Sequence, residues 1–243
     1  MLEFLLITVV GFAVGVINGM AGGASVISYP ILLATGLSPV SAAVTNAIGV
    51  TPANFFALIS IRGQIRAMFK EYAALIYISV VASIAGALLL LNMPPRIFEK
   101  IVPFLLFAAT ASLLVKVKPH RGKRHAIIDK VGIGASGFYC GYFGPGQGVL
   151  VIAVLARDAS RNPKTLNAAK NLVVGVTSAV SNVVYFFSGQ VNWALAAALL
   201  VGSTSGGTLG GRFASRVDPL VYKSLVLTVG FGASAWLFAK YLL

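Results

Sequence analysis

The chain has 243 residues, of which 58% are hydrophobic and 10% charged, and its mean hydropathy is +0.89. Soluble domains carry about 25% charged residues, so this composition excludes an ordinary soluble protein. Lys and Arg outnumber Asp and Glu by 19 to 6, but the basic residues lie between apolar runs, which is typical of cytoplasmic loops rather than of a nucleic-acid interface. We therefore expect an all-α, multi-pass protein of the plasma (inner) membrane that contacts lipids and binds no nucleic acid.

The apolar segments occur in two series of five. They cover residues 3–20, 24–35, 41–61, 72–93 and 98–115, and then 127–143, 148–156, 165–187, 193–211 and 219–242. The second segment of each series is too short to cross a hydrocarbon core of about 30 Å at about 1.5 Å per residue. These two segments are either half-helices that complete a crossing or re-entrant segments that turn back.

Each short segment follows a glycine-rich interruption. The first reads Asn-Gly-Met-Ala-Gly-Gly-Ala-Ser over residues 18–25, and the second reads Gly-Tyr-Phe-Gly-Pro-Gly-Gln-Gly over residues 141–148. The pair Thr45 and Asn46 follows the first interruption, and Lys170 and Asn171 stand 125 positions later, behind the second. Two copies of one unit with a broken helix in each are typical of secondary transporters that bind their substrate at mid-membrane.

Loop charge favours one arrangement of these segments. If all ten segments cross, fifteen basic residues gather on one side and three on the other; if the short segments turn back, the split is ten to eight. The positive-inside rule favours the first arrangement, which makes the two copies inverted. We expect a first repeat over residues 1–115, a basic cytoplasmic linker over 116–130 and a second repeat over 131–243. Eight membrane helices with two re-entrant segments are the alternative.

Enzyme and metal signatures are missing from the sequence. There is no phosphate-binding loop motif, and His120 and His125 have no third residue at zinc-ligand spacing. The acidic residues all lie at segment ends or in loops: Glu3, Glu71, Glu99, Asp129, Asp158 and Asp218. We therefore expect no catalytic residue, no metal and no cofactor. A membrane interior without carboxylates is also a poor site for a cation, so the predicted substrate is a small anion.

Candidate anion ligands lie in and behind the two interruptions. Lys170 would compensate the charge of the anion, or alternatively extend to the cytoplasmic surface. Asn46 and Asn171 would donate amide hydrogens to it, or alternatively bond across a helix interface. Half-helices that start near Ala24 and Gly148 would offer free N–H groups and a positive dipole end. The expected substrate-binding residues are Asn18, Gly22, Gly23, Ser25, Thr45, Asn46, Gly146, Gln147, Gly148, Lys170 and Asn171; Ser25 is also the expected N-cap.

The ordered motifs resemble the TauE/SafE family of sulfite exporter-like permeases. They are Gly-x-x-Asn-Gly-x-Ala-Gly-Gly at residues 15–23, Tyr-Pro at 29–30, Gly-Leu-Ser-Pro at 36–39 and Ala-Val-Thr-Asn at 43–46, followed by the second interruption with Lys170 and Asn171. The resemblance covers nearly the whole chain. It implies transport of small sulfur oxyanions or organosulfonates, usually outward across the plasma membrane.

The predicted function is export of sulfite or an organosulfonate by alternating access around a site between the repeats. The sequence leaves three alternatives open: an anion channel, a carrier of another small anion such as a carboxylate, and a membrane enzyme, for which only Cys140 offers a buried nucleophile. It also leaves open the coupling ion, the transport direction and whether the chain forms an oligomer.

Overall fold

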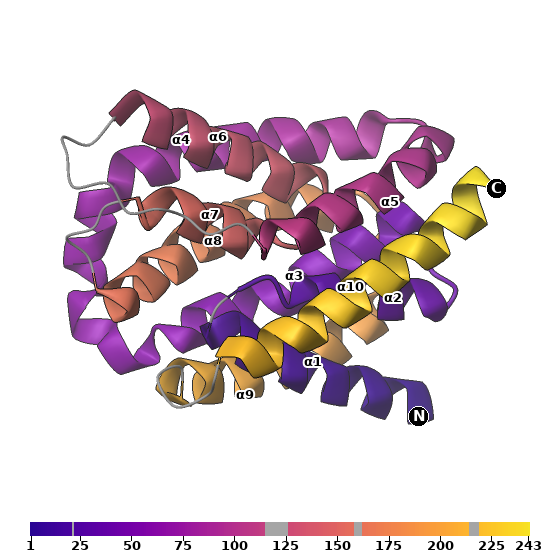
Figure 1. Ribbon diagram of the computed structural model, residues 1–243, viewed down its shortest axis with the longest axis horizontal. Coiled ribbons are helices and arrows are strands. Elements are labelled where there is room, and N and C mark those ends of the chain that lie inside the picture. The colour runs from indigo at the N-terminus through magenta and orange to yellow at the C-terminus, as the bar shows by residue number, and fades with distance from the viewer. Residues whose placement is uncertain (21, 115–125, 158–161, 214–218) are drawn as a thin grey trace.

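The computed structural model describes residues 1–20, 22–114, 126–157, 162–213 and 219–243, and these residues are helical without any strand. The first half contains α1 (Leu2–Met20), α2 (Ser25–Ala34), α3 (Pro39–Ala57), the 3₁₀ helix η1 (Ile59–Gln64), α4 (Ile65–Asn92) and α5 (Pro95–Ser112). The second half contains α6 (Ala126–Tyr142), α7 (Gln147–Leu155), α8 (Pro163–Phe186), α9 (Trp193–Phe213) and α10 (Pro219–Leu242). Each helix covers one of the apolar segments (Figure 1).

The third helix of each half begins with the same local device. Ser38 precedes α3 and accepts a hydrogen bond from the Ser41 N–H at 3.2 Å, and Pro39 occupies the first helical turn. Asn162 precedes α8 and accepts from the Thr165 N–H at 2.8 Å, again with a proline in the first turn. A polar cap followed by proline satisfies a free donor and presets the helical φ, so both helices start at a fixed residue.

The boundary between α3 and α4 differs from the one expected. The apolar segment over residues 41–61 ends early as a helix, because α3 stops at Ala57 and η1 follows with non-helical dihedral angles at Ile61 (φ −125°, ψ 22°). Helix α4 starts at Ile65, before the expected residue 72, and its first turns carry Arg66 and Lys70. Hydropathy marks neither change, because Ile61 at the kink is apolar and the added turns of α4 contain the charged residues Arg66, Lys70 and Glu71.

Three helical stretches are long and apolar enough to span a bilayer by length and composition: Leu2–Met20, Ile61–Asn92 and Lys223–Leu242. Large apolar side chains such as Leu5, Tyr77 and Phe104 lie exposed on the outside of the bundle, as expected of a surface that faces lipid. These features agree with a membrane protein. The number of helices that cross the bilayer stays a prediction.

Helices pack in pairs that each join one helix of the first half to one helix of the second, and we call these exchanged pairs. Helix α1 lies along α9 and α4 lies along α6, while α3 contacts α9 and α8 contacts α4. The close approach depends on glycine: a Cβ on Gly141 of α6 would overlap the Ser83 carbonyl oxygen of α4, and one on Gly202 of α9 would overlap the Thr8 carbonyl oxygen of α1. Small residues of this kind let membrane helices meet backbone to backbone. The two interrupted helices are therefore each fixed to a continuous helix of the other half.

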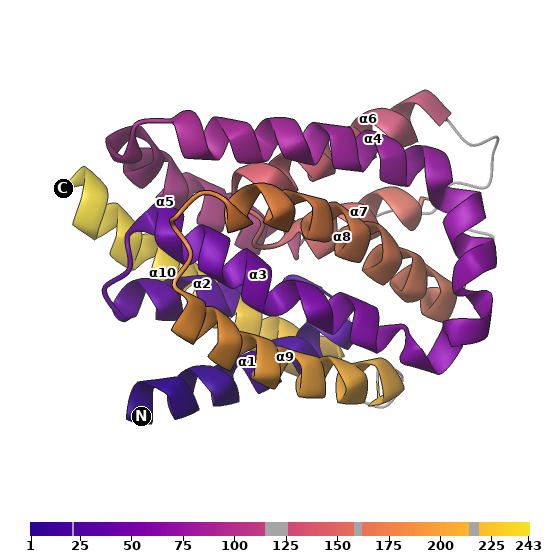
Figure 2. The ribbon, with the colours of Figure 1, turned by 180° about the vertical axis from the view of Figure 1, so that it is seen from behind.

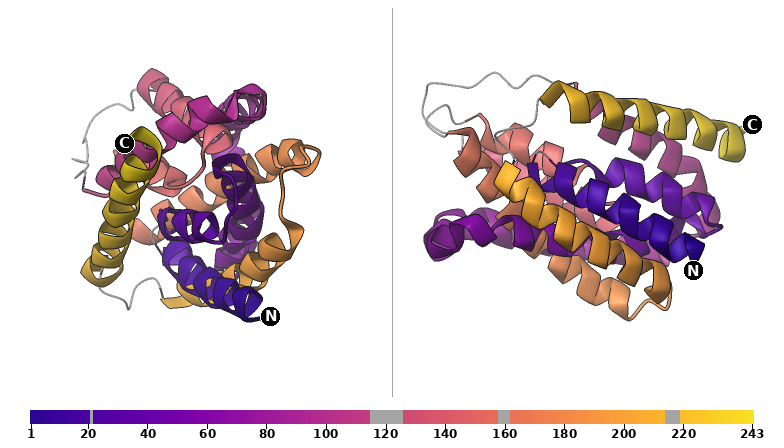
Figure 3. Two further views of the ribbon diagram at one scale, coloured as in Figure 1. Left: turned by 90° about the vertical axis from the view of Figure 1, so that its right-hand side faces the viewer. Right: turned by 90° about the horizontal axis from the view of Figure 1, so that it is seen from below.

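The remaining pairs place α3 and α8 at the centre. These two helices contact each other and lie between α4 on one side and α9 on the other (Figure 2). Both termini lie toward the same end of the bundle, and α1 begins at that end whereas α6 begins at the opposite one (Figures 1 and 3). The predicted repeat boundaries and inversion stay predictions, and residues 116–125 of the predicted linker lie outside the described residues.

Candidate functional site

Both glycine interruptions break a helix where the sequence predicts it. Helix α1 ends at Met20, and Gly22 and Gly23 then take left-handed dihedral angles (φ +84° and +85°) before α2 begins. Helix α6 ends at Tyr142, and Gly144 and Gly146 take the same conformation (φ +90° and +89°) before α7 begins. A side chain with Cβ disfavours such angles, so glycine is required to restart each helix in a new direction.

The two breaks meet each other inside the bundle. A Cβ on Gly22 would lie 3.2 Å from Gly148 Cα, and a Cβ on Gly148 would lie 3.2 Å from the Cδ atom of Lys170. The aliphatic part of Lys170 therefore lies directly against the junction of the breaks. The sequence places these segments about 125 residues apart, and the fold brings them into van der Waals contact.

The Lys170 ammonium caps the end of α1. The side chain is 0% exposed, and Nζ donates a hydrogen bond of 2.7 Å to the Asn18 carbonyl oxygen. Asn167, one turn earlier on α8, donates to the Gly19 carbonyl oxygen at 2.8 Å. Both acceptors belong to the last turn of α1, where carbonyl groups lack helical partners and the helix dipole favours a cation. The alternative expectation was that Lys170 extends to the cytoplasmic surface, and its buried side chain does not do so.

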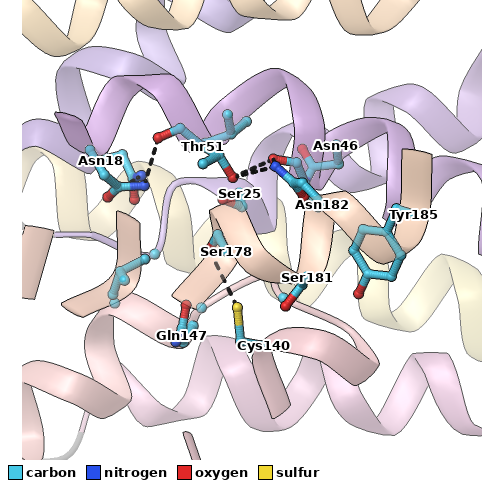
Figure 4. A pocket seen from close by; sticks show the side chains of 18 residues that line it. Asn18, Ser25, Asn46, Thr51, Cys140, Gln147, Ser178, Ser181, Asn182 and Tyr185 are labelled. Carbon is cyan, nitrogen blue, oxygen red and sulfur yellow. Dashed lines mark hydrogen bonds between the residues drawn. The ribbon is translucent and has the colours of Figure 1, made fainter. Parts of the chain in front are cut away.

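A small cavity opens beside this junction (Figure 4). The centre of a water molecule can occupy about 40 Å³ of it. Since one buried water needs about 10–15 Å³ by this measure, the space corresponds to roughly three waters. The lining residues are Asn18, Gly23, Ser25, Asn46, Ala47, Val50, Thr51, Asn54, Cys140, Gly144, Gly146, Gln147, Gly148, Val174, Ser178, Ser181, Asn182 and Tyr185.

Most of the expected site residues line this cavity, and four do not. Asn18, Gly23, Ser25, Asn46, Gly146, Gln147 and Gly148 line it. Gly22 and Lys170 lie at the junction just outside the lining. Thr45 is buried elsewhere and accepts a hydrogen bond of 3.0 Å from the Asn192 N–H. Asn171 is buried off the cavity wall, and its Oδ1 has no partner among the described residues.

Ser25 has a different role from the expected one. The residue that caps α2 is Ala24 (φ −63°, ψ −20°), and no side chain accepts a hydrogen bond there. Because Ala24 already has helical dihedral angles, Ser25 belongs to the first turn of the helix. Its side chain lines the cavity instead of capping the helix (Figure 4).

Several lining residues were not singled out from the sequence. Thr51, Ser178, Ser181 and Tyr185 are the polar ones. Extending a helical face from Asn46 would have found the α3 members, since the lining positions 46, 47, 50, 51 and 54 follow the helical period. The α8 members at 174, 178, 181, 182 and 185 follow the same rule.

Amides and hydroxyls of the lining also bond to one another. Asn18 Nδ2 lies 3.4 Å from Asn54 Oδ1, and Asn182 Nδ2 donates to Thr51 Oγ1 at 3.0 Å. Asn54 and Asn182 thus serve as both lining residues and interhelical contacts. The network links α1, α3 and α8 around the cavity (Figure 4).

Gln147 stands apart from this network. It is 2% exposed, it lines the cavity, and neither Nε2 nor Oε1 has a partner among the described residues. A buried amide without partners costs free energy unless water or a ligand completes its hydrogen bonds. Gln147 therefore has unused donor and acceptor capacity at the cavity wall.

The free N–H groups expected at the half-helices are partly used within the breaks. Gln147 N–H donates to the Gly144 carbonyl at 3.1 Å and Val149 N–H donates to the Gly146 carbonyl at 3.0 Å. In the first break, the Val26 N–H donates to the Gly23 carbonyl at 3.1 Å. These tight turns leave fewer backbone donors for a ligand, so side-chain amides and hydroxyls supply more of the polar surface.

The cavity carries no formal charge of its own. Its lining residues are all neutral, and the aliphatic part of Lys170 lies against the lining residue Gly148. The described residues give the Lys170 ammonium one hydrogen-bond partner and no carboxylate. In the described part of the chain, no three His, Cys, Asp or Glu side chains lie close enough to hold a metal ion.

Three relatives match the chain over most of their length. A probable membrane transporter protein of Haemophilus influenzae is 28% identical over 237 residues, covering 93% of this chain and 91% of that protein. Probable membrane transporter protein ORF9 of a Sinorhizobium species is 28% identical over 253 residues, covering 98% and 93%. Probable membrane transporter protein YfcA of Escherichia coli K12 is 25% identical over 240 residues, covering 93% and 86%.

No solved structure matches the chain. The family model described as sulfite exporter TauE/SafE matches residues 7–237, which is nearly the whole sequence. The chain therefore belongs to the TauE/SafE family.

Proposed function

We propose that this TauE/SafE protein carries a small anion, most of all sulfite or an organosulfonate, out of the cell across the plasma membrane. The observation that carries the proposal is the buried Lys170 ammonium at the junction of the two breaks. In its protonated form, the buried Lys170 side chain has no carboxylate partner among the described residues, so it places an uncompensated positive charge beside a neutral, polar cavity. That electrostatic environment favours an anion over a cation.

Binding would use the side-chain donors of both halves. In our proposal, Asn18, Asn46, Ser25 and Gln147 contact the anion, and Lys170 compensates its charge from behind the wall. Gln147 is the strongest of these donors, since its amide has no protein partner to give up among the described residues. The glycines at 22, 23, 146 and 148 would let the backbone approach the ligand. Thr45 and Asn171 would act indirectly, because they lie off the cavity wall.

The size of the cavity supports a ligand of a few atoms. Room for roughly three waters matches an anion with about four heavy atoms, such as sulfite. A longer organosulfonate would need the cavity to widen. In alternating access, this widening accompanies the opening of the cavity toward one side of the membrane at a time.

The exchanged helix pairs support an arrangement of two inverted repeats. Pairs α1–α9 and α4–α6 each combine the first helix of one half with the fourth helix of the other. Helices α1 and α6 also start from opposite ends of the bundle (Figure 1). We propose that the repeats cover residues 1–115 and 131–243 and that each exchanged pair moves as one body. The site between the repeats would then open alternately to the two sides of the membrane.

A flux assay in proteoliposomes tests this function. Vesicles that contain the protein are loaded with sulfite, thiosulfate, sulfoacetate, sulfate or acetate. They should release at least one sulfur anion faster than equally loaded liposomes without protein do. The variant Lys170→Met should lose most of that flux. Lys240→Met removes the same charge from an exposed position near the end of α10 and should keep it.

Two results would contradict the proposal. One is that none of the tested anions is released while the protein is folded and inserted. The other is a set of unitary currents in a planar bilayer, which would identify an anion channel instead of a carrier.

A further inference from the structure

Ser28 lies behind the cavity wall on the first half-helix. It belongs to α2, is 0% exposed and is not a lining residue. Its Oγ lies 2.5 Å from Asn46 Oδ1 on α3. Asn46 in turn lines the cavity (Figure 4). Ser28 is therefore bonded to a lining residue without lining the cavity itself.

The two atoms of this contact identify its donor. An amide oxygen carries no hydrogen and can only accept, whereas a serine hydroxyl can donate. The Ser28 hydroxyl therefore donates to Asn46 Oδ1. The Ser25 carbonyl, at 3.4 Å, is a much weaker alternative acceptor for the same hydroxyl.

This bond decides which end of the Asn46 amide meets the cavity. With Oδ1 held by Ser28, Nδ2 lies on the other side of the amide. No described residue accepts a hydrogen bond from Nδ2. Since Asn46 borders the cavity, its two N–H bonds are available to a ligand there.

We propose that Ser28 is a positioning residue that makes the site prefer anions, by holding the Asn46 amide with its donor face toward the ligand. Without the hydroxyl, the amide can rotate and present its oxygen, which repels an oxyanion. This inference deepens the proposed anion transport and rests on it.

The second half has no hydroxyl at the corresponding place. Counted from the start of each half-helix, Ser28 of α2 corresponds to Leu150 of α7, and Asn171 stands 125 positions after Asn46. Asn171 Oδ1 has no partner among the described residues, and Asn171 does not line the cavity. The oriented amide therefore belongs to the first half alone.

Anion affinity of the purified protein tests the role of Ser28. Ser28→Ala should weaken binding of the best-bound anion of the sulfur panel by up to about fivefold, the loss expected when the Asn46 donor itself is removed. Ser28→Thr, which keeps the hydroxyl, should stay within about twofold of the original affinity. Ser234→Ala removes another buried hydroxyl, bonded to the Gly230 carbonyl at 2.7 Å in α10, and should not change the affinity.

A double-mutant comparison separates positioning from a general loss of stability. In an Asn46→Ala background, Ser28→Ala should cause no further loss of affinity, because Ser28 acts through the Asn46 amide. Equal loss in both backgrounds would overturn the inference, and so would full affinity in Ser28→Ala. In either case the proposed anion transport would stand, whereas an original protein that binds no anion would overturn both.

Discussion

Thr45 and Lys170 occupy corresponding positions of the two halves, and they bond to opposite ends of two different helices. Thr45 in the first half accepts a hydrogen bond from the Asn192 N–H, immediately before α9 begins. Lys170, 125 positions later, donates to the Asn18 carbonyl at the end of α1. An acceptor suits the positive start of a helix and a cation suits its negative end. The comparison shows how one repeat position can yield a neutral contact in one copy and a buried charge in the other.

The neighbouring asparagines differ as well. Asn46 lines the cavity and is held by Ser28, whereas Asn171 lies off the wall with its oxygen unpartnered among the described residues. In the proposed site, the first half therefore supplies an oriented amide and the second half supplies the charge. A site assembled in this way is asymmetric even though the sequence motifs that build it are repeated.

The largest difference between the halves should come from substitutions at 45 and 170. Lys170→Met should weaken anion binding roughly 10- to 100-fold, since the attraction between opposite unit charges about 6–8 Å apart is about 2–3 kcal/mol at an effective dielectric constant of about 20. Thr45→Val keeps the shape of the side chain but loses the bond to Asn192, and should lower stability by about 1 kcal/mol with affinity unchanged. Binding isotherms and melting curves of both variants check this. Equal losses of affinity would break the comparison.

The breaks should also differ in their response to apolar substitution. Gln147→Leu removes an amide without partners among the described residues, so it should raise stability by about 1–2 kcal/mol while weakening anion binding about tenfold. Asn18→Leu should lower stability, because Asn54 Oδ1 loses its donor. Denaturation and ligand titration of the two variants measure both effects. A loss of stability in Gln147→Leu would contradict an unpartnered amide.

The glycines in contact at the junction differ in backbone strain. A Cβ at Gly22 and one at Gly148 would each meet the opposite backbone at 3.2 Å, but only Gly22 has a positive φ of the two. Gly22→Ala should therefore be less stable than Gly148→Ala by about 1–2 kcal/mol, the cost of a left-handed L-residue. Thermal unfolding of the two variants side by side gives this difference. A Gly148→Ala variant that is the less stable of the two would show that crowding at Lys170 dominates.

The smallest expected changes in anion affinity should distinguish Asn46 from Asn171. Asn46→Ala should weaken anion binding about fivefold, since it removes a donor from the cavity wall. Asn171→Ala should change binding by less than about twofold, because its side chain lies off the wall. Titration of both variants with the same anion decides this point, and a larger effect at Asn171 would reverse the assignment of the oriented amide.

The sequence predicts the elements of this site better than their contacts. Glycines followed by short apolar segments predict both breaks, because few residues other than glycine accept the left-handed backbone that restarts a helix. The reach of Lys170 to a carbonyl 152 residues away could not be predicted, since it depends on how α8 packs against the end of α1. Thr51 follows from Asn46 by the helical period, whereas Ser178 could not be placed before the orientation of α8 was known, because neither predicted residue of α8, Lys170 or Asn171, lines the cavity.

Anion binding to the detergent-solubilised protein tests the central claim most directly. The melting temperature should be followed while sulfite, thiosulfate, sulfoacetate, sulfate, choline or tetramethylammonium is added at constant ionic strength. A ligand that binds only the folded state raises the midpoint in proportion to its affinity. We predict that at least one sulfur anion raises it, that neither cation does, and that the rise disappears in Lys170→Met. A rise with the cations alone, or an anion effect that persists undiminished in both Lys170→Met and Gln147→Leu, would contradict an anion site between the two breaks.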